Sequence, residues 1–137
     1  MTERELRNLI ETYHVNTEMV SNLNAKIEAL DIKITACYGF NFGGSGFDSS
    51  KVEQYIEKKE QLRQRLDDLQ RKIVVVDIVV QILTKEERQV IEAMKIYQSK
   101  LNRMAKFLHK SRKYVFDTRE KSLKKMCAYL EGVFANI

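Results

Sequence analysis

Two long segments of the sequence carry apolar side chains at alternating spacings of three and four residues, and this spacing constrains the fold most strongly. In residues 3–37 the repeated positions are Leu6, Leu9, Tyr13, Asn16, Val20, Leu23, Ile27, Leu30, Ile34 and Cys37. In residues 52–83 they are Val52, Tyr55, Lys59, Leu62, Leu66, Leu69, Ile73, Val76, Val80 and Leu83. Such a repeat is typical of long helices that pack side by side as in a coiled coil. We therefore predict one long helix in each segment.

The composition favours helices throughout the chain. Its 137 residues include no proline and only 5 glycines, and these two residue types most disfavour a helix interior. Four of the glycines lie in residues 38–50, between the two segments. Two helices of similar length joined by such a loop are expected to fold back on each other. We therefore predict an all-α chain in which residues 1–83 form an antiparallel, coiled-coil-like helical hairpin with a Gly-rich loop at 38–50.

Three features of this hairpin leave alternatives open. Asn16 is the polar exception in the first repeat, and it is either buried and fixes the helix register or solvated near a frayed end. The loop carries Phe40, Phe42 and Phe47, which pack on the helices, meet a partner or belong to a mobile tip. Additional apolar residues widen the stripe at the end of the second helix: Val74, Val75, Ile78, Val79 and Ile82. That end must be buried on more than one side, against the C-terminal residues, a partner subunit or both.

Charge is distributed unevenly along the chain. Residues 1–83 contain 11 Lys and Arg and 13 Asp and Glu, a net charge of −2, whereas residues 84–137 contain 13 and 6, a net charge of +7. Residues 95–125 alone contain 11 basic and 2 acidic side chains. A basic half of this kind indicates a polyanionic partner, although a solvated helix surface without a partner explains the composition equally well.

The basic half has its own helix signals. Thr84 followed by Glu87 has the pattern of a capping box and is expected to start a helix. A second helix is expected from about Ser99. It should break before Ser111, which is suited to cap a third helix. Residues 84–137 are therefore expected to form a separate domain of three helices.

Three residues of this domain have the spacing that is typical of a helix-turn-helix. Ala105 lets a second helix cross closely, His109 falls in the turn four residues later, and Val115 fills the gap six residues further on. The helix that starts at Ser111 would then enter the major groove of duplex DNA. His109 stands where such turns usually have glycine, so it must adopt a positive φ or change the turn. We predict that residues 84–137 form a helix-turn-helix DNA-binding domain.

These residues resemble region four of the bacterial sigma factors. The resemblance is carried by residues 83–92, by Met104, Ala105, Leu108, Ser111, Tyr114 and Val115, and by residues 123–126. With the hairpin and the Gly-rich loop in front, the whole chain resembles the small phage regulators of late transcription of the ArpU and RinA type. The resemblance implies a sequence-specific DNA-binding transcription regulator of phage or prophage origin.

The resemblance also implies which side chains contact DNA. Contacts to base edges are expected from the exposed start of the third helix, at Arg112, Lys113, Phe116 and Asp117. Arginine pairs with guanine, phenylalanine contacts the methyl group of thymine, and aspartate accepts a hydrogen bond from cytosine. Contacts to phosphates, which position a protein without specifying sequence, are expected from Lys100, Ser111, Tyr114 and Arg119.

Three kinds of partner are expected: double-stranded DNA, further copies of the chain and RNA polymerase. A single small helix-turn-helix binds weakly, so a homodimer or higher homo-oligomer formed through the hairpin would raise affinity through effective concentration. Two other functions stay open. One is a protein-interaction module that binds RNA polymerase or inhibits another protein through a degenerate helix-turn-helix. The other is a small DNA-packaging subunit.

An enzymatic, metal-dependent or membrane-bound function is not expected. Acidic pairs such as Asp67 and Asp68 lie on a predicted exposed helix surface and not in a catalytic arrangement. The sequence has no histidine-based nucleophile system or metal-ligand spacing, so neither a metal nor a cofactor is expected. Cys37 and Cys127 occupy apolar helix positions and are expected to be buried, reduced thiols, and His14 and His109 stand alone. The start of the chain lacks the apolar region of a signal peptide, and no apolar stretch is long enough to span a bilayer. A cytoplasmic location in a bacterial host cell is therefore expected.

Overall fold

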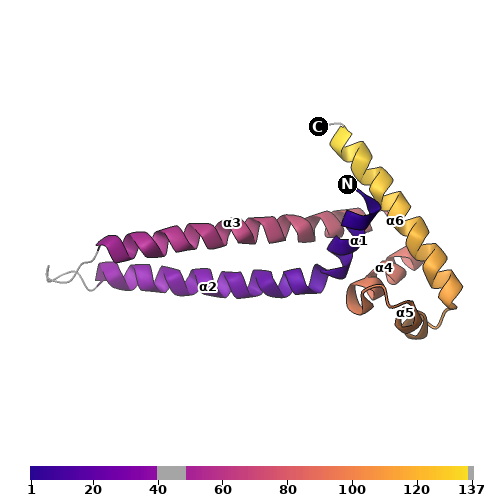
Figure 1. Ribbon diagram of the computed structural model, residues 1–137, viewed down its shortest axis with the longest axis horizontal. Coiled ribbons are helices and arrows are strands. Elements are labelled where there is room, and N and C mark those ends of the chain that lie inside the picture. The colour runs from indigo at the N-terminus through magenta and orange to yellow at the C-terminus, as the bar shows by residue number, and fades with distance from the viewer. Residues whose placement is uncertain (40–48, 136–137) are drawn as a thin grey trace. The chain divides into compact units, whose positions relative to one another are not determined.

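The fold is all-α in the residues that the structure describes, which are 1–39 and 49–135. In this computed structural model the helices are α1 (Glu3–Glu11), α2 (Tyr13–Gly39), α3 (Ser49–Val80), α4 (Lys85–Tyr97), α5 (Leu101–Leu108) and α6 (Arg112–Ala135) (Figure 1). No strand occurs in these ranges, which confirms the prediction of an all-α chain. Phe40, Phe42 and Phe47 of the Gly-rich loop lie outside the described residues. None of the described helices is both long enough and apolar enough to cross a membrane.

The chain divides into two compact units. Unit 1 consists of residues 1–16 and 72–137, and unit 2 consists of residues 17–71. A boundary after residue 83 was expected from the sequence, and this position lies inside unit 1. The reason is that α1 and the C-terminal part of α3 bury apolar side chains in the same core as α4, α5 and α6.

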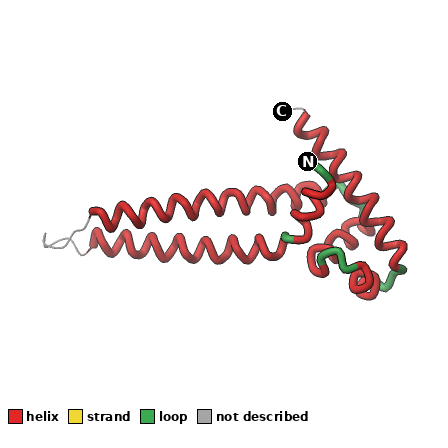
Figure 2. Tube along the Cα trace, in the orientation of Figure 1, coloured by secondary structure: helices red, strands yellow, loops and turns green. Residues whose placement is uncertain are grey.

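The first predicted helix is interrupted at Thr12, which separates α1 from α2 (Figure 2). Thr12 has φ −94° and ψ 4°, and its hydroxyl donates a hydrogen bond to the Asn8 carbonyl (2.7 Å). A threonine that bonds back onto the preceding turn often bends a helix. The expectation of one continuous helix over residues 3–37 was therefore wrong at this point. Leu6 and Ile10 belong instead to the core of unit 1.

The core of unit 1 joins α1 and the end of α3 to the three C-terminal helices. Its side chains without any exposed surface are Leu6, Ile10, Val76, Val79, Ile91, Met94, Met104, Val115, Leu123 and Met126. Helix α1 contacts α4 and α6, and α4, α5 and α6 contact one another. Val74 and Ile78 of α3 remain 48% and 49% exposed, so the apolar end of this helix is only partly covered.

A polar cluster fixes the start of α2 within unit 1. The Tyr13 hydroxyl donates to Asp77 Oδ1 of α3 (2.6 Å), and Lys95 Nζ of α4 lies 4.0 Å from the centroid of the Tyr13 ring. The hydrogen bond to Asp77, followed by burial, raises the pKa of Tyr13 to about 12. Asn16 is buried, and its amide nitrogen lies 3.3 Å from the Thr12 hydroxyl oxygen. The alternative of a solvated Asn16 is therefore wrong.

In unit 2 the helices α2 and α3 pack against each other. Their shared apolar cluster consists of Leu23, Ile27, Leu66 and Leu69. Lys59 forms an ion pair with Asp31, and Lys33 Nζ lies 5.7 Å from the centroid of the Tyr55 ring. Because residue numbers rise along α2 while those of their partners fall along α3, the two helices run antiparallel within this unit (Figure 1).

Candidate nucleic-acid interface

Helix α4 begins at the predicted capping box. The Thr84 N–H donates to Glu87 Oε1 (3.0 Å), and the Glu87 N–H donates to the Thr84 hydroxyl oxygen (3.3 Å). Lys125 Nζ of α6 donates to the same carboxylate oxygen of Glu87 (3.1 Å). Since Glu87 is only 4% exposed, a largely buried carboxylate joins the start of α4 to α6.

This carboxylate makes unit 1 sensitive to acid. Burial alone would raise the pKa of Glu87, but the hydrogen bonds from Thr84 and Lys125 outweigh it and hold the pKa below its ordinary value of 4.5. A carboxyl group with a lowered pKa stabilises the folded state above its unfolded pKa, and this contribution is lost as the pH falls through the folded pKa. We expect Glu87→Gln to lose less free energy of unfolding than wild type as the pH falls below 4.5, measured by urea denaturation. Equal losses in the two proteins would contradict this assignment.

Helix α5 begins later than predicted, because two residues before it have left-handed backbone conformations. Gln98 has φ 56° and Ser99 has φ 49°, and α5 then starts at Leu101 rather than near Ser99. Residues other than glycine adopt a positive φ at a cost in free energy. The Ser99 hydroxyl hydrogen-bonds to the Glu11 carboxylate of α1, so α1 helps to hold this turn.

The turn between α5 and α6 is closed at both ends by hydrogen bonds. His109 has φ 54° and ψ 40°, which confirms that it accepts the positive φ required in place of glycine. The Lys110 N–H donates to the Ala105 carbonyl (3.1 Å), as in a helix C-cap with a left-handed residue. The Ser111 hydroxyl oxygen accepts from the Tyr114 N–H (3.1 Å) and caps α6 as predicted.

The residues expected at the crossing of these two helices are buried. Ala105 of α5 is 9% exposed, and Val115 of α6 has no exposed surface. Met104, which precedes the small residue, is also fully buried. With both inner faces packed in the core of unit 1, the opposite face of α6 is left at the surface.

Six of the eight predicted contact residues are exposed: Lys100, Ser111, Arg112, Lys113, Phe116 and Asp117. Residues four apart on a helix lie on the same face. Arg112 therefore lies one turn before Phe116, and Lys113 lies one turn before Asp117. These four side chains form one exposed surface, which we call the α6 surface.

More basic side chains are exposed on α5, on the turn and along α6: Arg103, Lys106, Lys110, Lys121 and Lys124. Tyr114 is half-buried, and Lys110 Nζ lies 5.5 Å from the centroid of its ring. Exposed cations that outnumber nearby carboxylates attract polyanions. This part of unit 1 therefore has the electrostatic character that a phosphate backbone requires.

Arg119 is not at the surface, in contrast to its expected role at a phosphate. It is only 5% exposed, and its guanidinium group donates to Glu120 Oε1 through Nε (3.3 Å) and Nη2 (3.0 Å). Its Cζ atom lies 5.2 Å from the centroid of the Phe116 ring. We therefore exclude Arg119 from the proposed phosphate contacts.

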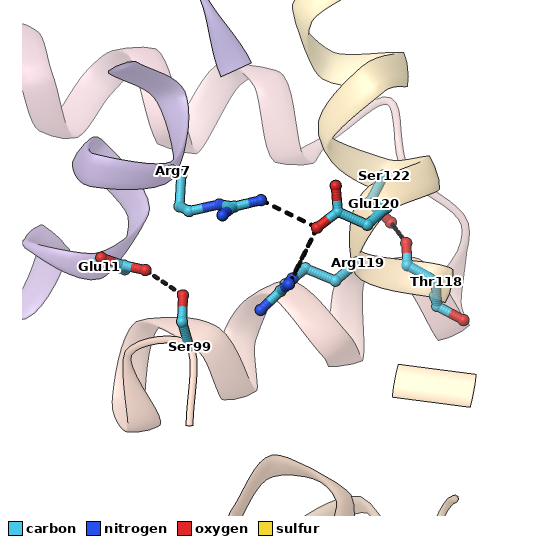
Figure 3. A network of polar contacts seen from close by, with 7 residues as sticks. All are labelled: Arg7, Glu11, Ser99, Thr118, Arg119, Glu120 and Ser122. Carbon is cyan, nitrogen blue, oxygen red and sulfur yellow. Dashed lines mark hydrogen bonds and ion pairs between the residues drawn. The ribbon is translucent and has the colours of Figure 1, made fainter. Parts of the chain in front are cut away.

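The carboxylate of Glu120 also binds α1. Arg7 Nη2 donates to Glu120 Oε1 at 2.9 Å, so this one oxygen accepts from two arginines on two different helices (Figure 3). Arg7 and Glu120 were not predicted from the sequence, because 113 residues separate them and no local pattern relates two such distant residues.

A groove of about 610 Å³ lies between α4 and the end of α5. Its lining residues are Lys85, Arg88, Gln89, Glu92, Phe107 and Leu108. Phe107 is 52% exposed, and its ring centroid lies 5.4 Å from that of Tyr97. Arg88 Nη2 donates to the backbone carbonyl of Gln81 (3.3 Å), which fixes one rim of the groove. The groove thus offers an aromatic ring and charged groups to a ligand.

Cysteine and histidine do not assemble into a site in the described part of the chain. Residues 1–39 and 49–135 contain no group of three or more His, Cys, Asp or Glu side chains that could hold a metal ion. Cys37 is half-buried and Cys127 is buried, and both are free thiols. Burial raises the pKa of Cys127.

The chain was also compared with known proteins. No protein-family model, no curated protein sequence and no solved structure matches the chain.

Proposed function

We propose that α4, α5 and α6 form a helix-turn-helix DNA-binding domain in a sequence-specific transcription regulator of phage or prophage origin. Helix α6 would enter the major groove with the end that starts near Ser111. The α6 surface would contact base edges through Arg112, Lys113, Phe116 and Asp117. Phosphates would be contacted by Lys100, Ser111 and Tyr114.

One observation carries this proposal. The left-handed residue His109 and the Ser111 cap turn the chain between two helices whose crossing buries Ala105 and Val115. The same crossing leaves Arg112 and Phe116 exposed at the start of α6. A packed inner face combined with an exposed, cationic and aromatic outer face is what a recognition helix requires.

We also propose that α2 and α3 form a coiled-coil-like hairpin through which the chain dimerises or forms higher homo-oligomers. The sequence repeats support it, as do two exposed apolar side chains of unit 2, Ile32 (65%) and Ile56 (48%), which a second copy would bury. The phage or prophage origin, and RNA polymerase as a further partner, rest on the resemblance to sigma region four and to the ArpU and RinA regulators.

Selection of bound duplexes from a random DNA pool by the full chain tests the proposal. We expect a preferred site, and a two-fold symmetric one if the chain dimerises. The affinity for that site can be measured by fluorescence anisotropy. Its logarithm should fall linearly with the logarithm of the salt concentration. The slope should be about 0.9 for each phosphate neutralised. Absence of duplex binding by the full chain even at low salt would contradict the proposal.

The groove between α4 and α5 favours a second candidate, a protein-interaction module. Phe107 lines this groove and is 52% exposed. An exposed aromatic side chain at a groove is a common anchor for a segment of a partner protein. In this case the full chain would retain binding to a protein partner while showing no salt-dependent affinity for duplex DNA. The two candidates therefore differ in the outcome of the same binding experiment.

A further inference from the structure

We propose that Glu120, held by Arg7 of α1, is a positioning residue that orients Phe116 for base contact by fixing Arg119. The inference rests on the proposed DNA-binding function and deepens it. It assigns a specificity role to three side chains that do not touch DNA themselves.

The carboxylate of Glu120 is the centre of the arrangement. Its Oε1 atom accepts from Arg7 Nη2 (2.9 Å), from Arg119 Nη2 (3.0 Å) and from Arg119 Nε (3.3 Å), as Figure 3 shows. Hydrogen bonds between charged groups are about twice as strong as those between neutral groups. Two contacts from the planar guanidinium of Arg119 fix its direction as well as its position.

Arg119 depends on this carboxylate because it is buried. Its side chain is 6% exposed, whereas that of Glu120 is 25% exposed and that of Arg7 is 37% exposed. A buried cation that loses its counter-charge is strongly destabilised where it lies. Without the carboxylate, Arg119 would leave its buried place for solvent, since Arg7 would also repel it.

Arg119 in turn supports Phe116. Its Cζ atom lies 5.2 Å from the ring centroid, within the range of a cation–π interaction. The ring is 44% exposed on the α6 surface, so one part of it contacts the guanidinium while the rest faces outward. Holding an exposed aromatic ring in one orientation before binding reduces the entropy lost on contact with a thymine methyl group.

Helix α1 makes this arrangement rigid. Leu6 and Ile10 have no exposed surface, so they anchor α1 in the core on either side of Arg7. Glu11 of the same helix bonds to Ser99 in the turn before α5. Sequence reading by α6 therefore depends on a helix from the opposite end of the chain.

Glu120→Gln in the full chain tests the inference, with Glu131→Gln as the control. Glu131 is exposed on α6, so its substitution makes the same change in charge on the same helix outside the arrangement. For Glu120→Gln we expect the preference for thymine at the step read by Phe116 to fall about three- to ten-fold. The slope of DNA affinity against salt concentration should not fall, because the freed Arg7 and Arg119 add cations to the surface of the protein. A merely structural role would instead weaken all duplexes alike.

The aromatic proton chemical shifts of Phe116 in the free protein give a second readout. They should change in Glu120→Gln and stay as in wild type in Glu131→Gln. Arg7→Gln keeps the Arg119–Glu120 pair and should give a smaller change, which maintains the test if Glu120→Gln fails to fold. Duplex binding with unaltered base preference and ring shifts in both Glu120→Gln and Arg7→Gln would overturn this inference alone. Failure of wild type to bind duplex would overturn the proposed function as well.

Discussion

Replacing Ile10 with alanine is expected to lower the free energy of unfolding of unit 1 by about 2–5 kcal/mol. Ile10 has no exposed surface, and it lies in one apolar cluster with residues of α3, α4, α5 and α6. Its truncation removes buried methyl groups and leaves a cavity that the surrounding helices can fill only in part. Urea denaturation of the full chain, followed by circular dichroism, measures the loss.

Ile96→Ala is the matched control for this experiment. Ile96 lies on α4 in the same unit but is 55% exposed, so the same substitution should change stability by no more than about 0.5 kcal/mol. A similar small effect for both variants would mean that α1 is not part of the folded core of unit 1.

Arg112→Ala is expected to cause the largest loss of DNA sequence preference. A bidentate contact from arginine to guanine contributes about 1–3 kcal/mol of discrimination, which corresponds to roughly a 5- to 150-fold loss at one base step. Arg112 is exposed in the first turn of α6, where a recognition helix reads bases. Lys113→Ala should also alter preference, at a neighbouring step. Competition between the preferred duplex and single-base variants measures both effects.

Lys100→Ala provides the contrast, because Lys100 is exposed in the turn before α5 rather than on the α6 surface. As a phosphate contact, its loss should weaken all duplexes alike and lower the salt slope by about one. Equal, non-selective losses for Arg112→Ala, Lys113→Ala and Lys100→Ala would contradict the division between base and phosphate contacts.

Short-range signals predicted the local structure of the C-terminal helices well. The Thr84–Glu87 capping box, the Ser111 cap and the positive φ at His109 each depend on residues within a few positions of one another. The burial of Ala105 and Val115 also follows from spacing within two adjoining helices. Such features are encoded locally, so the sequence alone is enough to find them.

Long-range packing explains what the sequence did not reveal. The repeat in residues 3–37 continues through Thr12 without a change in spacing, yet Leu6 and Ile10 are buried with the C-terminal helices. Arg119 is a basic residue like the exposed Arg112 and Lys113, and its partners Glu120 and Phe116 lie beside it on α6. Its burial depends on how α6 packs in unit 1, which the local sequence does not show. Arg7, which also binds the Glu120 carboxylate, comes from α1, and no local pattern connects this helix with α6.

The division of unit 1 between residues 1–16 and 72–137 sets an order of folding events. During synthesis α1 emerges first, but the residues that bury Leu6 and Ile10 are synthesised only after the whole of unit 2. Docking of α1 must close a loop that spans residues 17–71, and the entropy cost of closure grows with the length of the flexible loop. Pairing of α2 with α3 removes most of that flexibility in advance. Pairing of the antiparallel helices therefore lowers the entropy cost of bringing residues 1–16 and 72–137 together, which makes completion of unit 1 more favourable.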